Sequence, residues 1–330
     1  MNFPVAQRPF FAGLAALLLL YAAAGGRYHD QNFLSPEVAL GLFSDNAPLG
    51  LCAVGVALVL LAGSLDLSVG AVMGCTTIII ATLIEKLHLH PVAAVSLAVF
   101  AATINGAMMG AIIHFARLPA FIVTLAGLFI ARGGAYLISL ESIAIRDSGY
   151  KAIAAWAMPM GAALRIPLES LLLVGATSAA WAFLRYTRAG RYVYALGDNP
   201  EACIARGLPV ARTRITVHAL SGLCAGLGGF ALTLTLPAGT HTEGVGMELD
   251  AIAGCVIGGI LLRGGAGNIW GALIGTLVLG LIVLAVATFE TRQLTSGSTK
   301  VIIAGLLLGF VVLQRLMVGR TVQQTSHSPE

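Results

Sequence analysis

The stretch RYTRAGRYVYALGDNPEACIARGLPVARTR (residues 185–214) is the one long charged segment in a chain that is otherwise dominated by apolar runs. It contains six arginines and only two acidic residues, Asp198 and Glu201. A basic segment between apolar spans is typical of a loop on the cytoplasmic side of a membrane. Because this loop also contains the signals of a short helix, we interpret it as a structured surface that binds a partner.

The overall composition indicates a membrane protein. Of the 330 residues, 58% are hydrophobic and only 10% are charged, whereas about 25% charged residues is usual in soluble domains. The 40 glycines suit closely packed transmembrane helices. No lysine-rich run or basic patch with interleaved aromatic residues indicates a nucleic-acid partner. We predict an all-α integral membrane protein in which residues 1–330 form a single transmembrane domain embedded in the lipid bilayer.

About ten apolar segments are candidates for transmembrane helices, each of which needs roughly 20 residues to cross a bilayer. The segment 250–262 is short, so it either spans fully or forms a re-entrant or broken helix. The first segment also resembles a signal peptide with a cleavage site after its small residues. The candidate spans are residues 10–26, 47–63, 67–84, 91–116, 118–140, 168–184, 215–236, 250–262, 269–289 and 300–318.

The charge distribution orients these spans. With ten spans and a cytoplasmic N-terminus, the inner segments contain eleven basic residues and the outer segments contain seven. This difference has the sign that the positive-inside rule requires. We therefore expect a multi-pass protein with both termini in the cytoplasm.

Two short segments suggest an inverted internal repeat. LDLSVGAVMG (residues 65–74) matches LDAIAGCVIG (residues 249–258) at five of ten positions. In the ten-span arrangement the two segments enter the membrane from opposite sides, as in many transporters. Glycine-rich apolar sequence also matches itself by chance, so both interpretations remain open.

The basic loop contains signals for both ends of a helix. Asp198 or Asn199 can cap the start, and Pro200 and Glu201 favour the first turn. Gly207 is a typical stop. We predict a two-turn helix over residues 200–206, which needs a surface to pack on because so short a helix is marginal alone. The alternative is a solvated connector whose arginines only orient the chain.

A small set of polar side chains lies within the apolar segments or at their breaks. A charge inside a membrane is costly and normally faces a cavity or a partner. The charged members either line a transport path or have structural roles at helix ends or in ion pairs, and the asparagine fits an interhelical hydrogen bond. The set comprises Asp66, Ser68, Asn105, Thr124, Arg132 and Asp250.

Motifs of catalysis and nucleotide binding are missing. The sequence has no GxSxG, no HExxH, no paired intramembrane aspartates and no GxxxxGK[ST] phosphate loop. The five cysteines form no CxxC pattern, so we expect neither a bound metal nor a disulfide. These absences argue against an enzyme, and any ATP hydrolysis that drives transport must occur on another polypeptide.

Four ordered blocks stand out along the chain: LLAGSLDLSVGAVMG (60–74), LPAFIVTLAGLFIARG (118–133), AGRYVYALGDNPEACIARGLPV (189–210) and ELDAIAGCVIGGILLRGGAGNIWGALIG (248–275). Together they resemble the permease subunits of bacterial ribose-type ABC sugar importers, over roughly residues 47–318. Residues 125–145, with LDAIAGCVIGG (249–259) and VLQR (312–315), resemble most closely a permease of the galactofuranose importer.

The resemblance implies a location in the bacterial inner membrane and a set of partners. Two permease subunits would surround a central path, with ATPase subunits that bind ATP and Mg²⁺ beneath them and a periplasmic sugar-binding protein above. This chain would itself bind no cofactor. Because galactofuranose importers of this type pair two different permeases, we expect the second permease to be a paralogue rather than an identical copy.

The resemblance also implies roles for individual residues. The basic loop would be the coupling element that the ATPase receives. The modest polarity around Asp66, Ser68, Asn105 and Thr124 would suit weak contacts to a passing neutral sugar. Cys203 and Arg263 stand where the family often has alanine and serine. An ion-gradient-driven transporter, in which Asp66 or Asp250 binds a cation, is the alternative. The ATPase-coupling candidates are Arg191, Asp198, Glu201, Ala202, Arg206 and Gly207.

Overall fold

The computed structural model describes residues 8–27, 35–160 and 164–288, together with a few isolated positions between 301 and 309. Helices form most of this part of the chain, as expected. The candidate span 300–318 lies outside the continuously described residues. The helices are α1 (Arg8–Arg27), α2 (Pro36–Asp45), α3 (Ala47–Leu61), α4 (Val69–Glu85), α5 (Pro91–Phe115), α6 (Ala120–Ile138), α7 (Ser148–Ala154), α8 (Leu168–Tyr186), α9 (Arg188–Asp198), α10 (Pro200–Ala205), α11 (Val210–Thr235), α12 (Met247–Ile257) and α13 (Ile269–Thr288).

Each expected span before residue 290 contains one of these helices, but not all of them are long enough to cross a membrane. Among the described residues, α5, α6, α8 and α11 meet the length and apolarity that a crossing needs. The α2–α3 pair, bent by 57° at Asn46, is a fifth candidate as a broken span. Apolar stretches in α1, α4 and α13 are shorter. A count of ten crossing helices therefore remains a prediction.

Helix α12 occupies the segment that the sequence marks as short. It has eleven residues, and at 1.5 Å per residue it reaches about 16 Å, roughly half of a hydrocarbon core of about 30 Å. It ends at Ile257, and a loop over residues 258–268 then leads into α13. Among the two interpretations of this segment, the structure favours a short, broken element over a full span.

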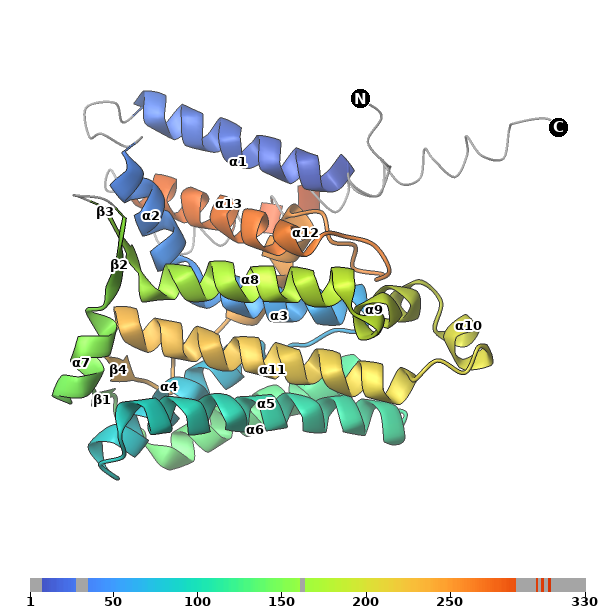
Figure 1. Ribbon diagram of the computed structural model, residues 1–330, viewed down its shortest axis with the longest axis horizontal. Helices are drawn as coiled ribbons and strands as arrows, with labels where there is room; N and C mark the ends of the chain where they lie inside the picture. Colours follow the sequence, from blue (N-terminus) through green and yellow to red (C-terminus); the bar gives the residue numbers. More distant parts are fainter. Residues whose placement is uncertain are drawn as a thin grey trace.

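Helices α3 and α11 form the centre of the helical body. Fourteen of the 15 residues of α3 are buried, so this helix is surrounded by protein on all sides. Helix α11 packs along α5, α3 and α4, and glycines on it allow close contact with α5. Figure 1 shows α8, α3, α11, α5 and α6 stacked with their axes roughly parallel, with α13 and α1 on one side.

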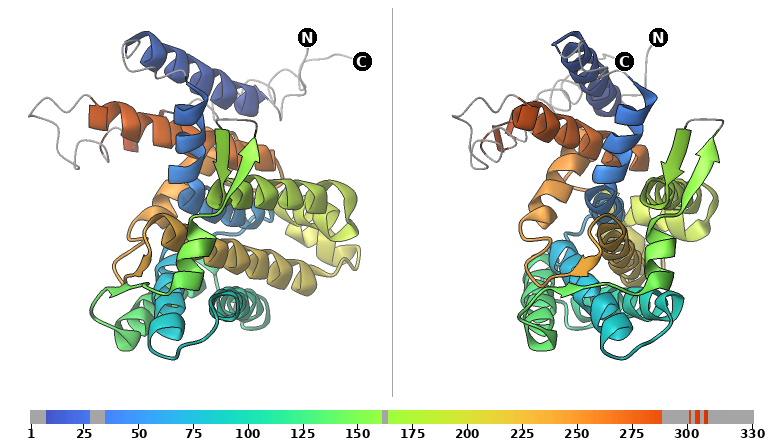
Figure 2. Two further views of the ribbon diagram at one scale, coloured as in Figure 1. Left: turned by 60° about the vertical axis from the view of Figure 1, so that its left-hand side comes forward. Right: turned by 90° about the vertical axis from the view of Figure 1, so that its left-hand side faces the viewer.

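The two ends of this helical body differ. Helices α9 and α10 lie at one end, and α7 with the strands lies at the opposite end (Figures 1 and 2). The strands form two small antiparallel sheets, which the prediction of an all-α protein did not include. They are β1 (Ile143–Ala144) paired with β4 (Ala238–Gly239), and β2 (Ala157–Met160) paired with β3 (Leu164–Pro167).

The segments that suggested an inverted repeat begin their helices differently. Asp66 lies three residues before the first residue of α4, whereas Asp250 lies three residues after the first residue of α12. The two aspartates therefore do not occupy equivalent positions relative to their helices. The inverted repeat stays a prediction.

Candidate functional site

Helix α10 forms the tip of the end that carries the basic residues. The side chain of Asn199 accepts a 2.9 Å hydrogen bond from the Ala202 backbone N–H, which is the N-cap that the sequence predicts. At the other end, Gly207 has φ +67°, a left-handed conformation that favours glycine. The helix ends at Ala205, one residue before the expected end at residue 206.

One side of α10 is anchored and the other is open. Cys203 is buried, and its carbonyl accepts a hydrogen bond from the Leu208 N–H at 3.0 Å. Glu201, Arg206 and the side chain of Ile204, which is 66% exposed, face away from the protein. An exposed isoleucine beside charged groups is a suitable contact surface for another protein. In Figure 1, α10 projects past the ends of α8 and α11.

Helix α9 is the part of the basic loop that the sequence interpretation missed. Its apolar face, formed by Gly190, Val193 and Leu196, is buried, while Arg188 and Arg191 are exposed. The spacing of these apolar residues at three-residue intervals is a helical signal, which the surrounding arginines obscured. The Thr187 hydroxyl caps the helix by accepting from the Gly190 N–H at 2.9 Å.

The C-terminal end of α9 contacts two segments that are distant in sequence. Gly197 packs against the Leu61 carbonyl at the end of α3 and against the Gly265 amide, and a Cβ at residue 197 would collide with both. The Gly265 N–H in turn donates to the Leu61 carbonyl at 3.0 Å. The Tyr194 hydroxyl donates to the Gly267 carbonyl at 3.1 Å. A displacement of α9 would therefore act directly on α3 and on the loop between α12 and α13.

Three of the predicted path residues lie close together at the break between α3 and α4. Asp66 is only 2% exposed, and its carboxylate accepts from the Ser68 N–H at 2.9 Å, the Ser68 hydroxyl at 2.6 Å and the Ser221 hydroxyl at 2.7 Å. The Thr124 hydroxyl lies 3.4 Å from the Leu65 carbonyl. The buried carboxylate is thus satisfied by hydrogen bonds, so that in this conformation it ties the break to α11.

The other predicted path residues lie elsewhere. Arg132 on α6 donates to the carbonyls of His241 and Glu243 at 2.6 and 2.5 Å, so it holds the loop that precedes α12. Asp250 is in the first turn of α12, and Asn105 lies on α5 with a buried Oδ1 that has no hydrogen-bond partner among the described residues. The structure therefore does not bring all six residues together.

Two residues that the sequence interpretation did not select belong to these regions. Ser221 joins the Asp66 cluster from α11, and no local pattern could indicate a contact across 155 residues. Glu248 lies against Gly70, and its buried Oε2 has no hydrogen-bond partner in the described part of the chain. Its position in the first turn of α12, just before the apolar segment 250–262, was the available signal.

The described residues give no indication of bound metal. No group of three or more His, Cys, Asp or Glu side chains is arranged to hold an ion within residues 8–27, 35–160 and 164–288. At the α9 end, burial raises the pKa of Tyr194 above its ordinary value. Burial thus favours the protonated hydroxyl, which is the form that donates to Gly267.

Comparison with known proteins identifies the family. Residues 38–312 match the family described as the permease component of branched-chain amino acid transport systems. The inner membrane ABC transporter permease protein YjfF of Escherichia coli (strain K12) is 39% identical over 285 residues, which cover 86% of this chain and 85% of that protein. The ribose import permease protein RbsC of the same strain is 34% identical over 272 residues, covering 82% and 83% of the two chains.

A more distant relative extends the range of sugars. The fructose import permease protein FruG of Bifidobacterium longum (strain NCC 2705) is 29% identical over 308 residues, covering 92% of this chain and 88% of that protein. These relatives are membrane transport components rather than enzymes. The chain therefore belongs to this family of permease components, and within it to the permease subunits of ABC sugar importers.

Proposed function

We propose that this chain forms part of the path for a monosaccharide across the bacterial inner membrane, and that α10 couples that path to a separate ATPase. The observation that carries the proposal is the form of α10, a helix capped at both ends and anchored by Cys203, with Ile204 exposed at the tip of the molecule. A rigid, protruding helix can transmit movement of a partner because its own shape is fixed by its packing.

The contacts of α9 connect α10 to the helices that are proposed to form the path. Gly197 lies directly against the end of α3 and the loop before α13, so a shift imposed on α10 reaches that loop and α3, the helix that leads into the break containing Asp66. ATP-driven closure of the partner would favour one membrane conformation over the other through this contact. The candidates for direct contact with the ATPase are Arg191, Asp198, Glu201, Ala202, Arg206 and Gly207.

The charge distribution supports an orientation with α10 in the cytoplasm. Six arginines of the segment 185–214 gather at the α10 end, whereas the end with α7 and the strands carries fewer basic residues, namely Lys86, Arg146, Lys151 and Arg165. This arrangement follows the positive-inside rule. We propose on this basis that both termini are cytoplasmic, and reporter fusions at each end would test the proposal.

We further propose that the transported sugar is galactofuranose and that the second permease is a paralogue. The support is the sequence resemblance of residues 125–145, 249–259 and 312–315 to a galactofuranose permease. Uptake of labelled galactofuranose, ribose and fructose should be compared in cells with and without this chain. Loss of galactofuranose uptake alone supports the assignment, and loss of ribose or fructose uptake alone would overturn it. The mass of the purified complex distinguishes a paralogous pair from an identical one.

The coupling proposal is tested by recovery of the ATPase. Tagged full-length protein is purified from native membranes in mild detergent, as wild type and as the Glu201→Arg/Gly207→Pro double variant. The charge reversal changes the exposed face of α10, and proline cannot adopt the positive φ of residue 207. We expect the wild type to bring down an ATPase and the variant to lose it.

A matched control separates an effect at α10 from a general effect of charge reversal on the protein. Glu141→Arg makes the same charge reversal at an exposed residue of the opposite end, and it should retain the ATPase. Thermal unfolding of all three proteins checks that the variants are folded. Full ATPase recovery by a folded α10 variant would contradict the coupling role of α10.

A further inference from the structure

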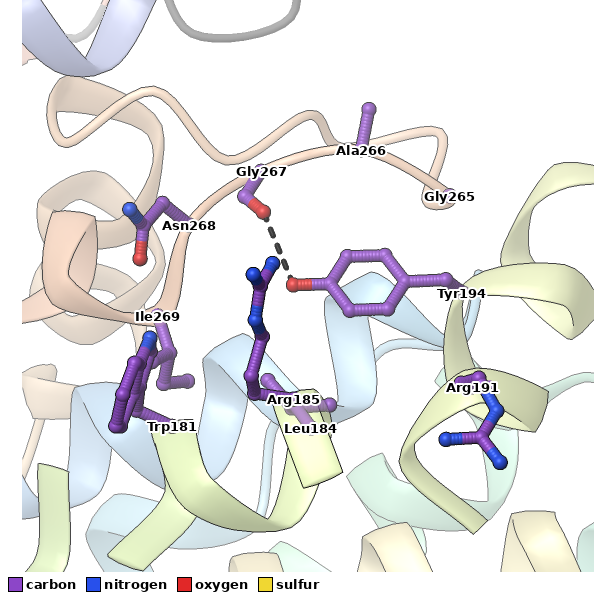
Figure 3. A pocket seen from close by; sticks show the side chains of 10 residues that line it. All are labelled: Trp181, Leu184, Arg185, Arg191, Tyr194, Gly265, Ala266, Gly267, Asn268 and Ile269. Atoms are coloured by element: carbon purple, nitrogen blue, oxygen red, sulfur yellow. Dashed lines mark hydrogen bonds between the residues drawn. The ribbon is translucent and has the colours of Figure 1, made fainter. Parts of the chain in front are cut away.

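A pocket of about 530 Å³ lies between the end of α8, α9 and the loop that precedes α13. Figure 3 shows its lining side chains, with Arg185 extending toward the Tyr194 hydroxyl and Gly267, and with Trp181 and Asn268 beside it. Arg191 lines another part of the same pocket. The contact of Tyr194 with Gly267 fixes one wall, so the pocket is a formed feature of this end of the molecule.

Several side chains in the pocket, some charged and some neutral, have hydrogen-bond donors without a partner among the described residues. Among the described residues, neither Arg185 nor Arg191 has an ion-pair or side-chain hydrogen-bond partner, and no acidic side chain lines the pocket. The Asn268 Oδ1 accepts from the Trp270 N–H at 3.1 Å, which leaves the side-chain amide nitrogen free to donate. The Arg185 guanidinium, with the free Asn268 amide near it, matches the oxygens of a phosphate group.

The surroundings of the pocket are those of a membrane interface. Trp181 and Tyr186 form an edge-to-face pair with ring centroids 5.5 Å apart, and both rings are partly or largely exposed at the end of the apolar helix α8. Tryptophan and tyrosine concentrate where a transmembrane helix leaves the hydrocarbon. About two helical turns before Trp181 on α8, Val174 is also exposed. A ligand in the pocket would therefore have its charged part at the headgroup level and an apolar surface beside it.

We propose that this pocket binds the phosphate of an anionic phospholipid in the cytoplasmic leaflet, whose acyl chains lie along α8. The assignment to that leaflet rests on the orientation proposed above. Basic pockets on the cytoplasmic side of membrane proteins are suited to such headgroups because the phosphate is held by guanidinium groups at the bilayer surface. The lipid would contact α8, α9 and the loop before α13 together, and it would thereby brace the segment that supports α10.

The test compares two arginines of the same loop. Full-length protein is purified as wild type, Arg185→Gln and Arg188→Gln, and native mass spectrometry measures the binding of phosphatidylglycerol and of phosphatidylcholine. Arg188 is exposed on α9 but does not line the pocket, so its variant matches the charge loss. We expect wild type to prefer phosphatidylglycerol, Arg185→Gln to lose about fivefold in that binding, and Arg188→Gln to bind like wild type.

Other outcomes would overturn the proposal in distinguishable ways. Equal losses in both variants would mean general electrostatic attraction rather than a site. Displacement of the lipid by millimolar inorganic phosphate would make the ligand a free anion. Unchanged lipid binding together with loss of the ATPase in Arg185→Gln would make the pocket a protein-docking surface. If wild type bound phosphatidylglycerol but recovered no ATPase, the coupling proposal would fail while the lipid site stood.

Discussion

The Ser221 hydroxyl on α11 donates a 2.7 Å hydrogen bond to the Asp66 carboxylate at the break between α3 and α4. Both residues are buried, at 0% and 2% exposure. The pair joins the central helix α11 to the connection that leads into α4. A buried carboxylate in this position is stable only while its donors are in place.

Replacement of Ser221 by alanine should therefore destabilise the protein. The change removes one of three donors to Asp66, and leaving a buried polar group short of a partner costs about 1–3 kcal/mol. Thermal unfolding of the purified protein in detergent measures the loss. Ser178→Ala is the control, because the Ser178 hydroxyl bonds only to the Val174 carbonyl of its own helix. Unchanged stability with lost transport in Ser221→Ala would instead give the pair a role in the path.

Gly197 should tolerate no side chain. In Gly197→Ala the added methyl group would overlap the Leu61 carbonyl and the Gly265 amide, and overpacking of this kind costs about 1–3 kcal/mol. We expect a lower melting temperature and weaker coupling of ATP hydrolysis to transport. Gly133→Ala on α6 should be neutral, since a Cβ there meets no atom within 4 Å. Equal melting temperatures for the two variants would show that the α9–α3 contact can open freely.

Ile204 should contribute to ATPase binding without contributing to the fold. Its side chain is 66% exposed, and burying such a side chain in an interface stabilises by about 1.5–3 kcal/mol. Ile204→Ser is thus expected to weaken ATPase affinity by about 10- to 100-fold and to leave the melting temperature unchanged. Val245→Ser, at an equally exposed residue before α12, is the control in a binding titration. An Ile204→Ser protein with wild-type affinity would exclude the tip of α10 from the interface.

Arg132 should keep the loop before α12 in a fixed conformation. Without its guanidinium the carbonyls of His241 and Glu243 lose their donors, so Arg132→Gln should raise hydrogen exchange over residues 240–246. Arg132→Lys should have a smaller effect, because an ammonium can reach one carbonyl but lacks the fork geometry of arginine. Arg165→Gln changes an exposed arginine of β3 and serves as the reference. Protection of residues 240–246 that is unaffected in Arg132→Gln would contradict the structural role.

Sequence reasoning located the elements whose signals are local. Long apolar runs indicated α5 and α11, and the capping residues Asn199 and Gly207 indicated α10 to within one residue. Helix α9 was missed because its apolar side chains are interrupted by arginines, and the strands because each is only two to four residues long. Family resemblance then supplied the class of transporter, which the relatives support.

The parts that could not be predicted depend on contacts between distant segments. Whether Asp66 is open to a substrate or held by hydrogen bonds depends on where Ser221 lies, and that follows from the packing of α11 on α3. The same holds for Arg132, whose carbonyl partners are 109 and 111 residues away. Spacing along the chain carries no information about such pairs.

Helix α3 is apolar but has almost no contact with lipid, because other helices enclose it. A carbene reagent dissolved in the bilayer would react with exposed side chains such as Phe100 on α5 and Phe129 on α6. The reagent would leave α3 unlabelled, because 14 of the 15 residues of α3 are buried by other helices. The side chains of α3 are thus constrained by the size of the spaces between their neighbours, as in the interior of a water-soluble protein, rather than by solubility in hydrocarbon.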